Sequence, residues 1–273
     1  MPVMITGAES GAGRAVARAL LSTGGEVRAY LDAERCGEDD AAAWRRAGCK
    51  VALGTLDDEG HLESALEQAH TVVHLAGGPL AEPQAQLDEL ATVMSAAVGA
   101  GCRRFIWPTE LAALTAGENP YLQQQREGAD LLDELPMEVV TMRCALRYGV
   151  ADALTVALAG GLASAADPAA RHAPLHLDDL ADAVVAADSQ RGSRGELHFA
   201  IELVGPNVVP LGGFVERLRA VLAPSGASTP PRGLADWLSR SAVGGPEALG
   251  RQGTRIVEGL ARLAAAEVWP ERE

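Results

Sequence analysis

The chain opens with an apolar strand that leads into a glycine-rich turn, and the turn opens a helix. Residues 3–6 are Val-Met-Ile-Thr, residues 7–13 are Gly-Ala-Glu-Ser-Gly-Ala-Gly, and residues 14–23 carry apolar side chains at helical spacing. Glycines allow a tight turn, close approach of the backbone to a pyrophosphate and close packing of helix on strand. The helix N-terminus then offers N–H groups and a positive dipole end to phosphates. This order predicts a dinucleotide-binding unit, and a plain strand-helix-strand unit without ligand is the alternative.

The residues after the helix strengthen that prediction. Gly24 and Gly25 end the helix, and residues 26–31 read as a second strand that stops at Asp32. An acid about 20 positions past the glycine turn is placed to accept hydrogen bonds from ribose hydroxyls. The glycine spacing is G-x3-G-x-G rather than G-x-G-x-x-G, so the inference depends on turn, helix and acid occurring together.

Composition excludes several classes of function. The 37 acidic residues outnumber the 23 Lys and Arg, and a net charge of −14 disfavours nucleic acid and anionic membrane surfaces as partners. No apolar run approaches the length of a membrane span, and no signal-peptide pattern starts the chain, so we expect a cytoplasmic protein. The four cysteines form no Cys-x2-Cys pair and predict free thiols without a metal site.

Strand and helix patterns alternate over the first 150 residues, which predicts a doubly wound parallel sheet. The further strands are expected at 50–54, 71–76, 105–107 and 138–143, and the helices at 62–69, 87–100 and 121–135. After Gly149 the alternation fades, although 197–204 reads as a strand and 214–222 as a helix. We therefore expect an α/β fold with a Rossmann-type domain over 1–150, to which 174–204 returns. A small, mostly helical substrate lobe would comprise 151–173 and 205–273.

Four motifs in this frame carry a family resemblance. They are Thr6-Gly7…Gly11-x-Gly13, Val72-Val73-His74-Leu75-Ala76-Gly77, Met142-Arg143-x3-Arg147-Tyr148-Gly149, and Leu175-His176-Leu177-Asp178-Asp179-Leu180-Ala181. With them the chain resembles the short-chain dehydrogenase/reductase superfamily over residues 1–222. The resemblance is to its extended and atypical branch, which holds epimerase/dehydratase-like and NmrA-like proteins.

The resemblance implies a nicotinamide dinucleotide at the carboxyl edge of the sheet. NAD is favoured, with NADP possible, because Asp32 would repel a 2′-phosphate and relatives that prefer NADP often carry Arg there. Arg14 and Arg35 lie near enough in sequence to weaken this preference for NAD over NADP. The alternative is that both are solvated charges of a helix and a loop. The residues that would contact the cofactor are Gly7, Ser10, Gly11, Ala12, Gly13, Asp32, Thr55, Leu56, Leu75, Ala76 and Gly77.

The active site that the resemblance implies is altered in this chain. Relatives use Ser or Thr, a Tyr, and a Lys four residues later whose charge lowers the pKa of the phenol. Here Tyr121 is present, but Gln125 stands at the Lys position and brings no charge. Thr109 matches the hydroxyl position, and Glu110 beside it is similar to the acid of sugar-nucleotide dehydratases. We predict that the catalytic group consists of Tyr121, Thr109, Glu110 and Gln125. The alternative for Glu110 is that it is a solvated acid in a loop.

Two further residues are candidates for contact with a small-molecule substrate. His176 precedes a predicted helix, where packing or helix capping is the alternative role. Tyr148 lies where the sheet meets the expected lobe, with core packing as its alternative. The resemblance also allows a homodimer through the helices at 87–100 and 121–135.

Three functions follow from this sequence. The first is an NAD(P)-dependent oxidoreductase or epimerase/dehydratase-like enzyme on a small hydroxyl or carbonyl substrate. The second is an NmrA-like regulator that senses the cofactor without turnover, which Gln125 favours. The third is a non-redox acid/base enzyme that catalyses dehydration, isomerisation or cyclisation. Fold alone does not separate them.

Overall fold

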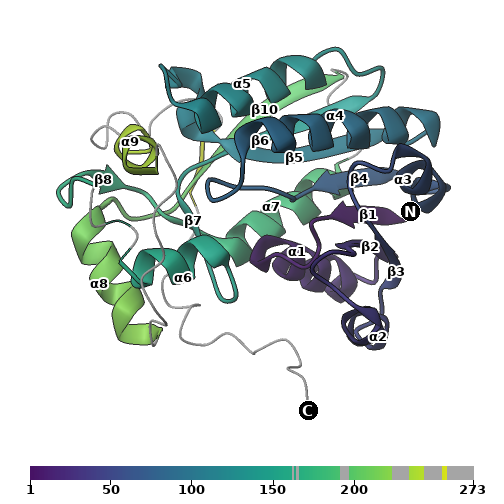
Figure 1. Cartoon of the computed structure of the whole chain (residues 1–273), viewed down its shortest axis with the longest axis horizontal. Helices are drawn as coiled ribbons and strands as arrows, with labels where there is room; N and C mark the ends of the chain where they lie inside the picture. The colour runs from purple at the N-terminus through teal and green to yellow at the C-terminus, as the bar shows by residue number, and fades with distance from the viewer. Residues whose placement is uncertain (162, 164–165, 191–196, 223–233, 243–253, 257–273) are drawn as a thin grey trace.

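The computed structural model describes residues 1–161, 163, 166–190, 197–222, 234–242 and 254–256. Its centre is an eight-stranded sheet in the order β12-β10-β6-β5-β4-β1-β2-β3 (Figure 1). Every neighbouring pair in this sheet is parallel, so the predicted doubly wound parallel sheet is confirmed. The strands are β1 Val3–Thr6, β2 Val27–Asp32, β3 Lys50–Gly54, β4 Thr71–His74, β5 Arg104–Glu110, β6 Glu138–Cys144, β10 His198–Val204 and β12 Thr254–Ile256.

Helices cover both faces of this sheet (Figure 1). One face carries α1 Gly11–Ser22, α2 Glu38–Arg46 and α7 Leu177–Ser189, and the other carries α3 Glu59–Leu66, α4 Pro83–Gly99 and α5 Pro120–Leu132. The sequence analysis did not predict α2. No described helix has the length and apolar character that crossing a membrane requires.

Side-chain caps fix where several of these helices begin. Ser10 Oγ accepts a hydrogen bond from Gly13 N at 2.9 Å, which starts α1 directly after the glycine turn. Asn119 Oδ1 accepts from Leu122 N at 3.1 Å, and Pro120 occupies the first helical position, where a missing N–H does no harm. The caps set the register of α5 and with it the direction of Tyr121.

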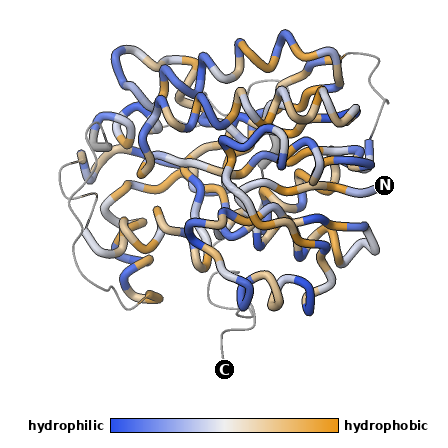
Figure 2. The backbone as a smooth tube through the Cα atoms, turned by 45° about the vertical axis from the view of Figure 1, so that its right-hand side comes forward, coloured by the Kyte–Doolittle hydropathy of each residue, from blue (hydrophilic) through white to orange (hydrophobic). Residues whose placement is uncertain are grey.

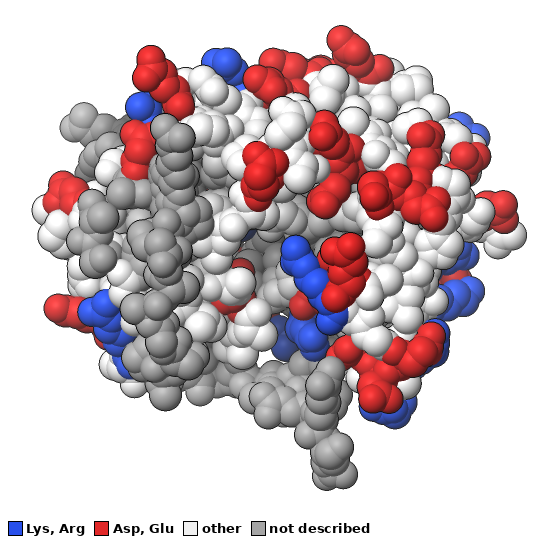
Figure 3. All heavy atoms as spheres, in the orientation of Figure 1, with Lys and Arg blue, Asp and Glu red and all other residues white. Residues whose placement is uncertain are grey.

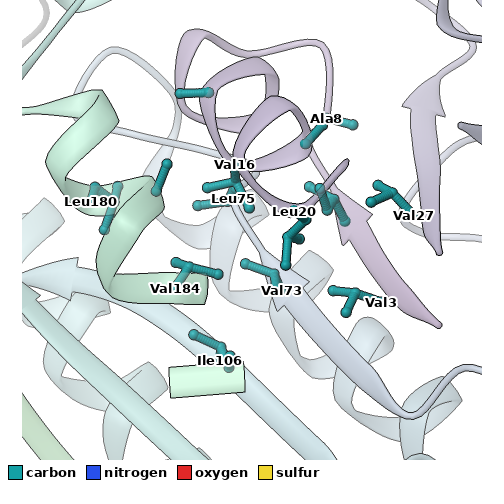
Figure 4. Close-up of a cluster of buried hydrophobic side chains, with 14 of the residues drawn as sticks. Val3, Ala8, Val16, Leu20, Val27, Val73, Leu75, Ile106, Leu180 and Val184 are labelled. Atoms are coloured by element: carbon teal, nitrogen blue, oxygen red, sulfur yellow. The ribbon is translucent and has the colours of Figure 1, made fainter. Parts of the chain in front are cut away.

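The sheet core is built from small and branched apolar residues. Val3, Val16, Leu20, Val73 and Leu180 meet where α1 and α7 pack on the strands (Figure 4). Apolar segments run through the central layer, while the outer helices alternate between apolar and polar (Figure 2). Burial of these side chains, at about 25 cal/mol per Å² of apolar surface, is what holds the two helical layers to the sheet.

A second apolar cluster lies beside the carboxyl end of the sheet. Helices α6 Ala153–Ala159, α8 Leu211–Val221 and α9 Leu234–Arg240 meet there, together with Tyr121, Tyr148 and Phe214. Short ladders join β7 Arg147–Tyr148 to β9 Leu175–His176, and β8 Arg171–His172 to β11 Val209–Pro210. The lobe boundaries remain a prediction. Residues 254–256, which the sequence analysis assigned to the lobe, pair with β10 in the main sheet.

The strand order reverses direction between β1 and β4. From β1 the chain moves outward through β2 to β3, and β4 then returns to the other side of β1. In open parallel sheets ligands bind outside the carboxyl ends of the strands at such a reversal. The glycine turn follows β1, so it lies at this point.

Candidate functional site

A cavity of about 860 Å³ opens at the β1–β4 reversal. Its volume falls in the range of small-molecule and cofactor sites. The surface is hollowed near its centre, and basic and acidic side chains stand together around the hollow (Figure 3). All the predicted cofactor residues except Gly13 line this cavity, namely Gly7, Ser10, Gly11, Ala12, Asp32, Thr55, Leu56, Leu75, Ala76 and Gly77.

The glycines of the turn are required by the packing of the protein itself. Gly7 has φ +68°, and a Cβ on it would lie 2.4 Å from the backbone nitrogen of Ala76. A Cβ on Gly11 would lie 2.9 Å from the backbone of Asp152, and one on Gly13 would lie 2.4 Å from Ala8 O. The turn is therefore the junction of β1, the end of β4 and the segment that enters the lobe.

The start of α1 fits a dinucleotide diphosphate. Gly11 and Ala12 line the cavity at the first turn of the helix, where backbone N–H groups and the helix dipole favour an anion. Ser10 holds this turn by its cap to Gly13 N. Gly11 has no side chain and has no room for one beside Asp152, so no side chain at this position covers the backbone that faces the cavity. This first turn therefore suits a phosphate.

The carboxylate of Asp32 lies at the other side of the turn, at the end of β2. Its Oδ1 accepts from Glu34 N at 2.9 Å, and its Oδ2 pairs with Arg35 Nε at 3.1 Å. A carboxylate has about four acceptor positions, so Asp32 keeps the capacity to accept ribose hydroxyls. Arg14 is directed elsewhere, because its Nε donates to Glu9 O at 3.2 Å and its guanidinium lies over the Trp44 ring.

Sequence reasoning missed the residues that shape the loop after β4. Gln86 on α4 accepts a hydrogen bond from Gly78 N at 2.7 Å, and a Cβ on Gly77 would lie 2.3 Å from Gln86 Oε1. Gln86 thereby fixes the loop that closes one wall of the cavity. Only the pairing of two elements in space shows this role, since Gln86 follows the loop by several residues on a separate helix.

The four predicted catalytic residues come together in a buried cluster behind the cavity. Thr109 Oγ1 donates to Gln125 Oε1 at 2.7 Å, and Gln125 Nε2 donates to Gln124 Oε1 at 3.0 Å. The Tyr121 hydroxyl donates to Glu110 Oε1 at 3.1 Å. None of the four predicted residues is among those that line the cavity. Their catalytic roles remain predictions.

Arg147, which the sequence offered only as part of a family motif and not as a site residue, completes this cluster. Its Nη2 donates to Glu110 Oε1 at 2.6 Å, and it also lines the cavity. Burial raises the pKa of Tyr121 well above its ordinary value of 10, and Glu110 raises it further, while Arg147 acts in the opposite direction. Because Gln125 brings no charge, the cation near the phenol comes from β7 and is paired with Glu110. The Tyr121 hydroxyl therefore keeps its proton and donates it in a hydrogen bond to Glu110.

The two predicted substrate residues lie in the packed region between sheet and lobe. His176 caps α7, since its Nδ1 accepts from Asp178 N at 3.2 Å. The ring of Tyr148 packs edge-on against His176 and against Phe214, with centroids 5.0 Å and 5.1 Å apart. Neither residue is among those lining the cavity, and their contact with a substrate remains a prediction.

Comparison with known proteins places this geometry in a family. A family model described as NAD(P)H-binding matches residues 7–187. The fold is similar to a nucleoside-diphosphate-sugar epimerase from Staphylococcus aureus, with TM-score 0.66, 16% identity, and coverage of 92% of this chain and 92% of that one. It is also similar to UDP-glucose 4-epimerase from Thermus thermophilus in complex with NAD, with TM-score 0.65, 15% identity, and coverage of 85% and 88%.

A third structure shares the fold at lower identity. UDP-N-acetylglucosamine 4-epimerase from Bacillus cereus has TM-score 0.63 and 12% identity, with coverage of 89% of this chain and 94% of that one. No curated protein matches this chain in sequence. The family model covers well over half of the chain. The predicted resemblance to the extended and atypical short-chain dehydrogenases/reductases is therefore confirmed, and the chain belongs to the NAD(P)H-binding family.

Proposed function

We propose that this protein binds NAD in the cavity at the β1–β4 reversal and does not use Tyr121 as the acid/base group of a hydride-transfer reaction. The observation that carries this proposal is the hydrogen bond from the Tyr121 hydroxyl to the buried carboxylate of Glu110. The cofactor half of the site keeps its predicted residues around one cavity, whereas the tyrosine is separate from it. Such a protein would bind the nucleotide without Tyr121 taking part in a reaction on it.

Each part of the cavity has a role in holding the dinucleotide. The first turn of α1 would hold the diphosphate through backbone N–H groups, and Asp32 would accept hydrogen bonds from the adenosine ribose. Leu75, Ala76 and Gly77 would line the path toward the nicotinamide. When bound, NAD would supply a hydride acceptor, but Tyr121 is not among the described residues that line the cavity.

Charge supports NAD over NADP. The acidic residues that line the cavity are Glu9, Asp32, Glu34, Asp57, Glu82, Asp88, Glu89 and Asp152, whereas the basic ones are Arg35 and Arg147. A 2′-phosphate adds nearly two negative charges to this surrounding, and like charges a few ångströms apart repel by a few kcal/mol at a protein surface. The ribose 2′-hydroxyl of NAD carries no such penalty.

Isothermal titration calorimetry with NAD+, NADH, NADP+ and NADPH tests this proposal. We expect NAD to bind, NADP to bind at least about tenfold more weakly, and Tyr121→Phe to bind NAD within about twofold of the wild type. Tyr121→Phe is a matched variant because it removes only the hydroxyl. If none of the four nucleotides binds at millimolar concentration, the proposal is wrong.

A second candidate function is an epimerase- or dehydratase-like enzyme acting on a small hydroxyl or carbonyl compound. It is favoured by the likeness to epimerase structures and by Thr109 and Glu110, which adjoin each other at the end of β5. Turnover of a panel of such compounds with added NAD, lost in Tyr121→Phe, would establish this candidate. Activity that persists without added nucleotide would instead favour the non-redox acid/base enzyme.

A further inference from the structure

Glu9 is a carboxylate inside the glycine turn, on the cavity wall that Asp32 shares. It reaches the site from the end of β1, whereas Asp32 reaches it from the end of the neighbouring strand β2. Its Oε2 is buried and has no hydrogen-bond partner among the described residues. A buried carboxylate oxygen without a donor is unfavourable, so it is poised to accept a hydrogen bond from a ligand.

The charges around Glu9 are unevenly matched. Arg35 is the cation nearby, but its Nε already pairs with Asp32 Oδ2 and its side chain is 72% exposed. Arg14 donates from its Nε to the carbonyl oxygen of Glu9 at 3.2 Å. Burial raises the pKa of Glu9 above its ordinary value, and the charge of Asp32 raises it further, while its own backbone, Arg35 and the backbone of Asp32 lower it. Two carboxylates therefore share one exposed arginine.

We propose that Glu9 is a second specificity-determining residue of the ribose subsite, one that accepts a ribose hydroxyl and excludes a 2′-phosphate. The inference rests on the proposed binding of NAD and adds a residue to it. The two hydroxyls of an adenosine ribose match two carboxylates that come from adjacent strands. A phosphate on one of those oxygens would meet both negative charges.

This arrangement predicts that removing Asp32 alone does not convert the site to NADP. Asp32→Asn frees Arg35 from its ion pair. Glu9 nevertheless keeps its negative charge, and its buried Oε2 is less exposed to solvent than the Arg35 side chain. Glu9→Gln alone leaves Asp32 paired with Arg35. The double variant removes both charges and leaves Arg35 free to pair with the phosphate, as guanidinium groups do well.

The test is calorimetric titration of NAD+ and NADP+ into the wild type, Glu9→Gln, Asp32→Asn and the double variant. We expect each single variant to weaken NAD+ by about tenfold, since each removes the charge from one hydrogen-bond acceptor. We expect the ratio of the NADP+ to the NAD+ dissociation constant to fall by about tenfold in each single variant and by a further tenfold or more in the double variant. Glu34→Gln is the matched control, because Glu34 lines the same cavity but its side chain is exposed, so solvent and salt screen its charge and the ratio should fall by no more than about twofold.

The outcomes separate the two proposals. If the wild type binds no NAD+, the proposed function fails. If the wild type binds NAD+ and the ratio in Glu9→Gln equals that of the wild type, or that of Glu34→Gln, then Glu9 is a structural residue of the turn and this inference is wrong. Circular dichroism checks that the variants fold. Glu9→Ser is a second variant, because turns accept small polar residues such as serine.

Discussion

The Tyr121 hydroxyl and Arg147 Nη2 donate to the same oxygen, Glu110 Oε1, at 3.1 Å and 2.6 Å. One carboxylate thus joins a residue of α5 to a residue of β7 through the end of β5. The relationship explains why Tyr121 is not free to donate a proton to a ligand. It also means that Glu110 adds to the rise in the pKa of Tyr121 that burial causes first.

Glu110→Gln should lower both stability and the pKa of Tyr121. The change leaves the largely buried Arg147 without its counter-charge, which should reduce the free energy of unfolding by about 3 kcal/mol. It also removes an acceptor and a charge that raise the pKa of the phenol, and it leaves Arg147, which lowers it. Urea denaturation measures the first effect and the tyrosinate absorbance as a function of pH measures the second. The shift of the titration curve that Glu110→Gln causes should vanish when both proteins also carry Tyr121→Phe; if it persists, it belongs to one of the other two tyrosines.

Gln125→Lys restores the charge that relatives carry four residues after the tyrosine. Thr109 would lose its acceptor at 2.7 Å and a cation would enter a buried position, so we expect a loss of about 2 kcal/mol in the free energy of unfolding. The pKa of Tyr121 should fall relative to the wild type. Gln125→Met is the matched control, with a similar loss of stability and no fall in that pKa. Equal titration curves for the two variants would mean that the added charge does not reach the phenol.

Alanine at Gly7 and at Gly24 separates backbone strain from backbone contact. Both glycines have positive φ, at +68° and +76°, but only a Cβ on Gly7 meets a neighbour, at 2.4 Å from Ala76 N. We expect Gly24→Ala to cost about 1 kcal/mol of stability, from strain alone. Gly7→Ala should cost about 3 kcal/mol or more, because β1 and the end of β4 must separate. Thermal denaturation of the two variants side by side gives the comparison, and equal midpoints would contradict the contact.

Stability should fall as the pH falls from 7 to 5, and His74 should carry much of the fall. Burial lowers the pKa of His74 to about 4, from an ordinary value of 6.5, and its Nδ1 lies 2.8 Å from Thr6 Oγ1. Between those two values the unfolded chain binds a proton that the folded chain does not, so stability is complete above pH 6.5 and is lost toward pH 4. This contributes about 2 kcal/mol between pH 7 and pH 5.

Urea denaturation of the wild type and of His74→Asn at both pH values tests the role of this histidine. The variant should be less stable at pH 7 and should depend less on pH by that amount. His172, whose pKa burial also lowers to about 4, adds to the dependence that remains. An unchanged pH dependence in His74→Asn would show that other groups are responsible.

Most of the predicted cofactor residues line one cavity, as expected from determinants that are local in sequence, and their contact with a cofactor remains a prediction. Gly7, Gly11 and Gly13 follow one strand within a single turn, and Asp32 ends the next strand. Parallel neighbouring strands bring their carboxyl ends to one edge, so the spacing alone placed these residues together. Glu9 lies in the same turn, but its meaning depends on burial, and no pattern of residue types reports burial at a turn.

The catalytic half could be predicted only as a set of residue types. Tyr121, Gln125, Thr109 and Glu110 were identified by position, and the structure brings them into one cluster. That none of the four lines the cavity depends on hydrogen bonds between separate elements. Arg147, from a two-residue strand far along the chain, pairs with the carboxylate that also accepts the hydrogen bond of Tyr121.

The sequence by itself determined the doubly wound parallel sheet and the glycine turn that follows its first strand. These features follow from local periodicity, turn chemistry and the handedness of crossover connections, which act over a few tens of residues. The tertiary structure alone decided that the glycines serve contacts with Ala76 and Asp152, and that the Tyr121 hydroxyl is bound to Glu110. Those relationships are set by packing and by charge pairing between residues distant in the chain, and short-range sequence patterns carry no record of them.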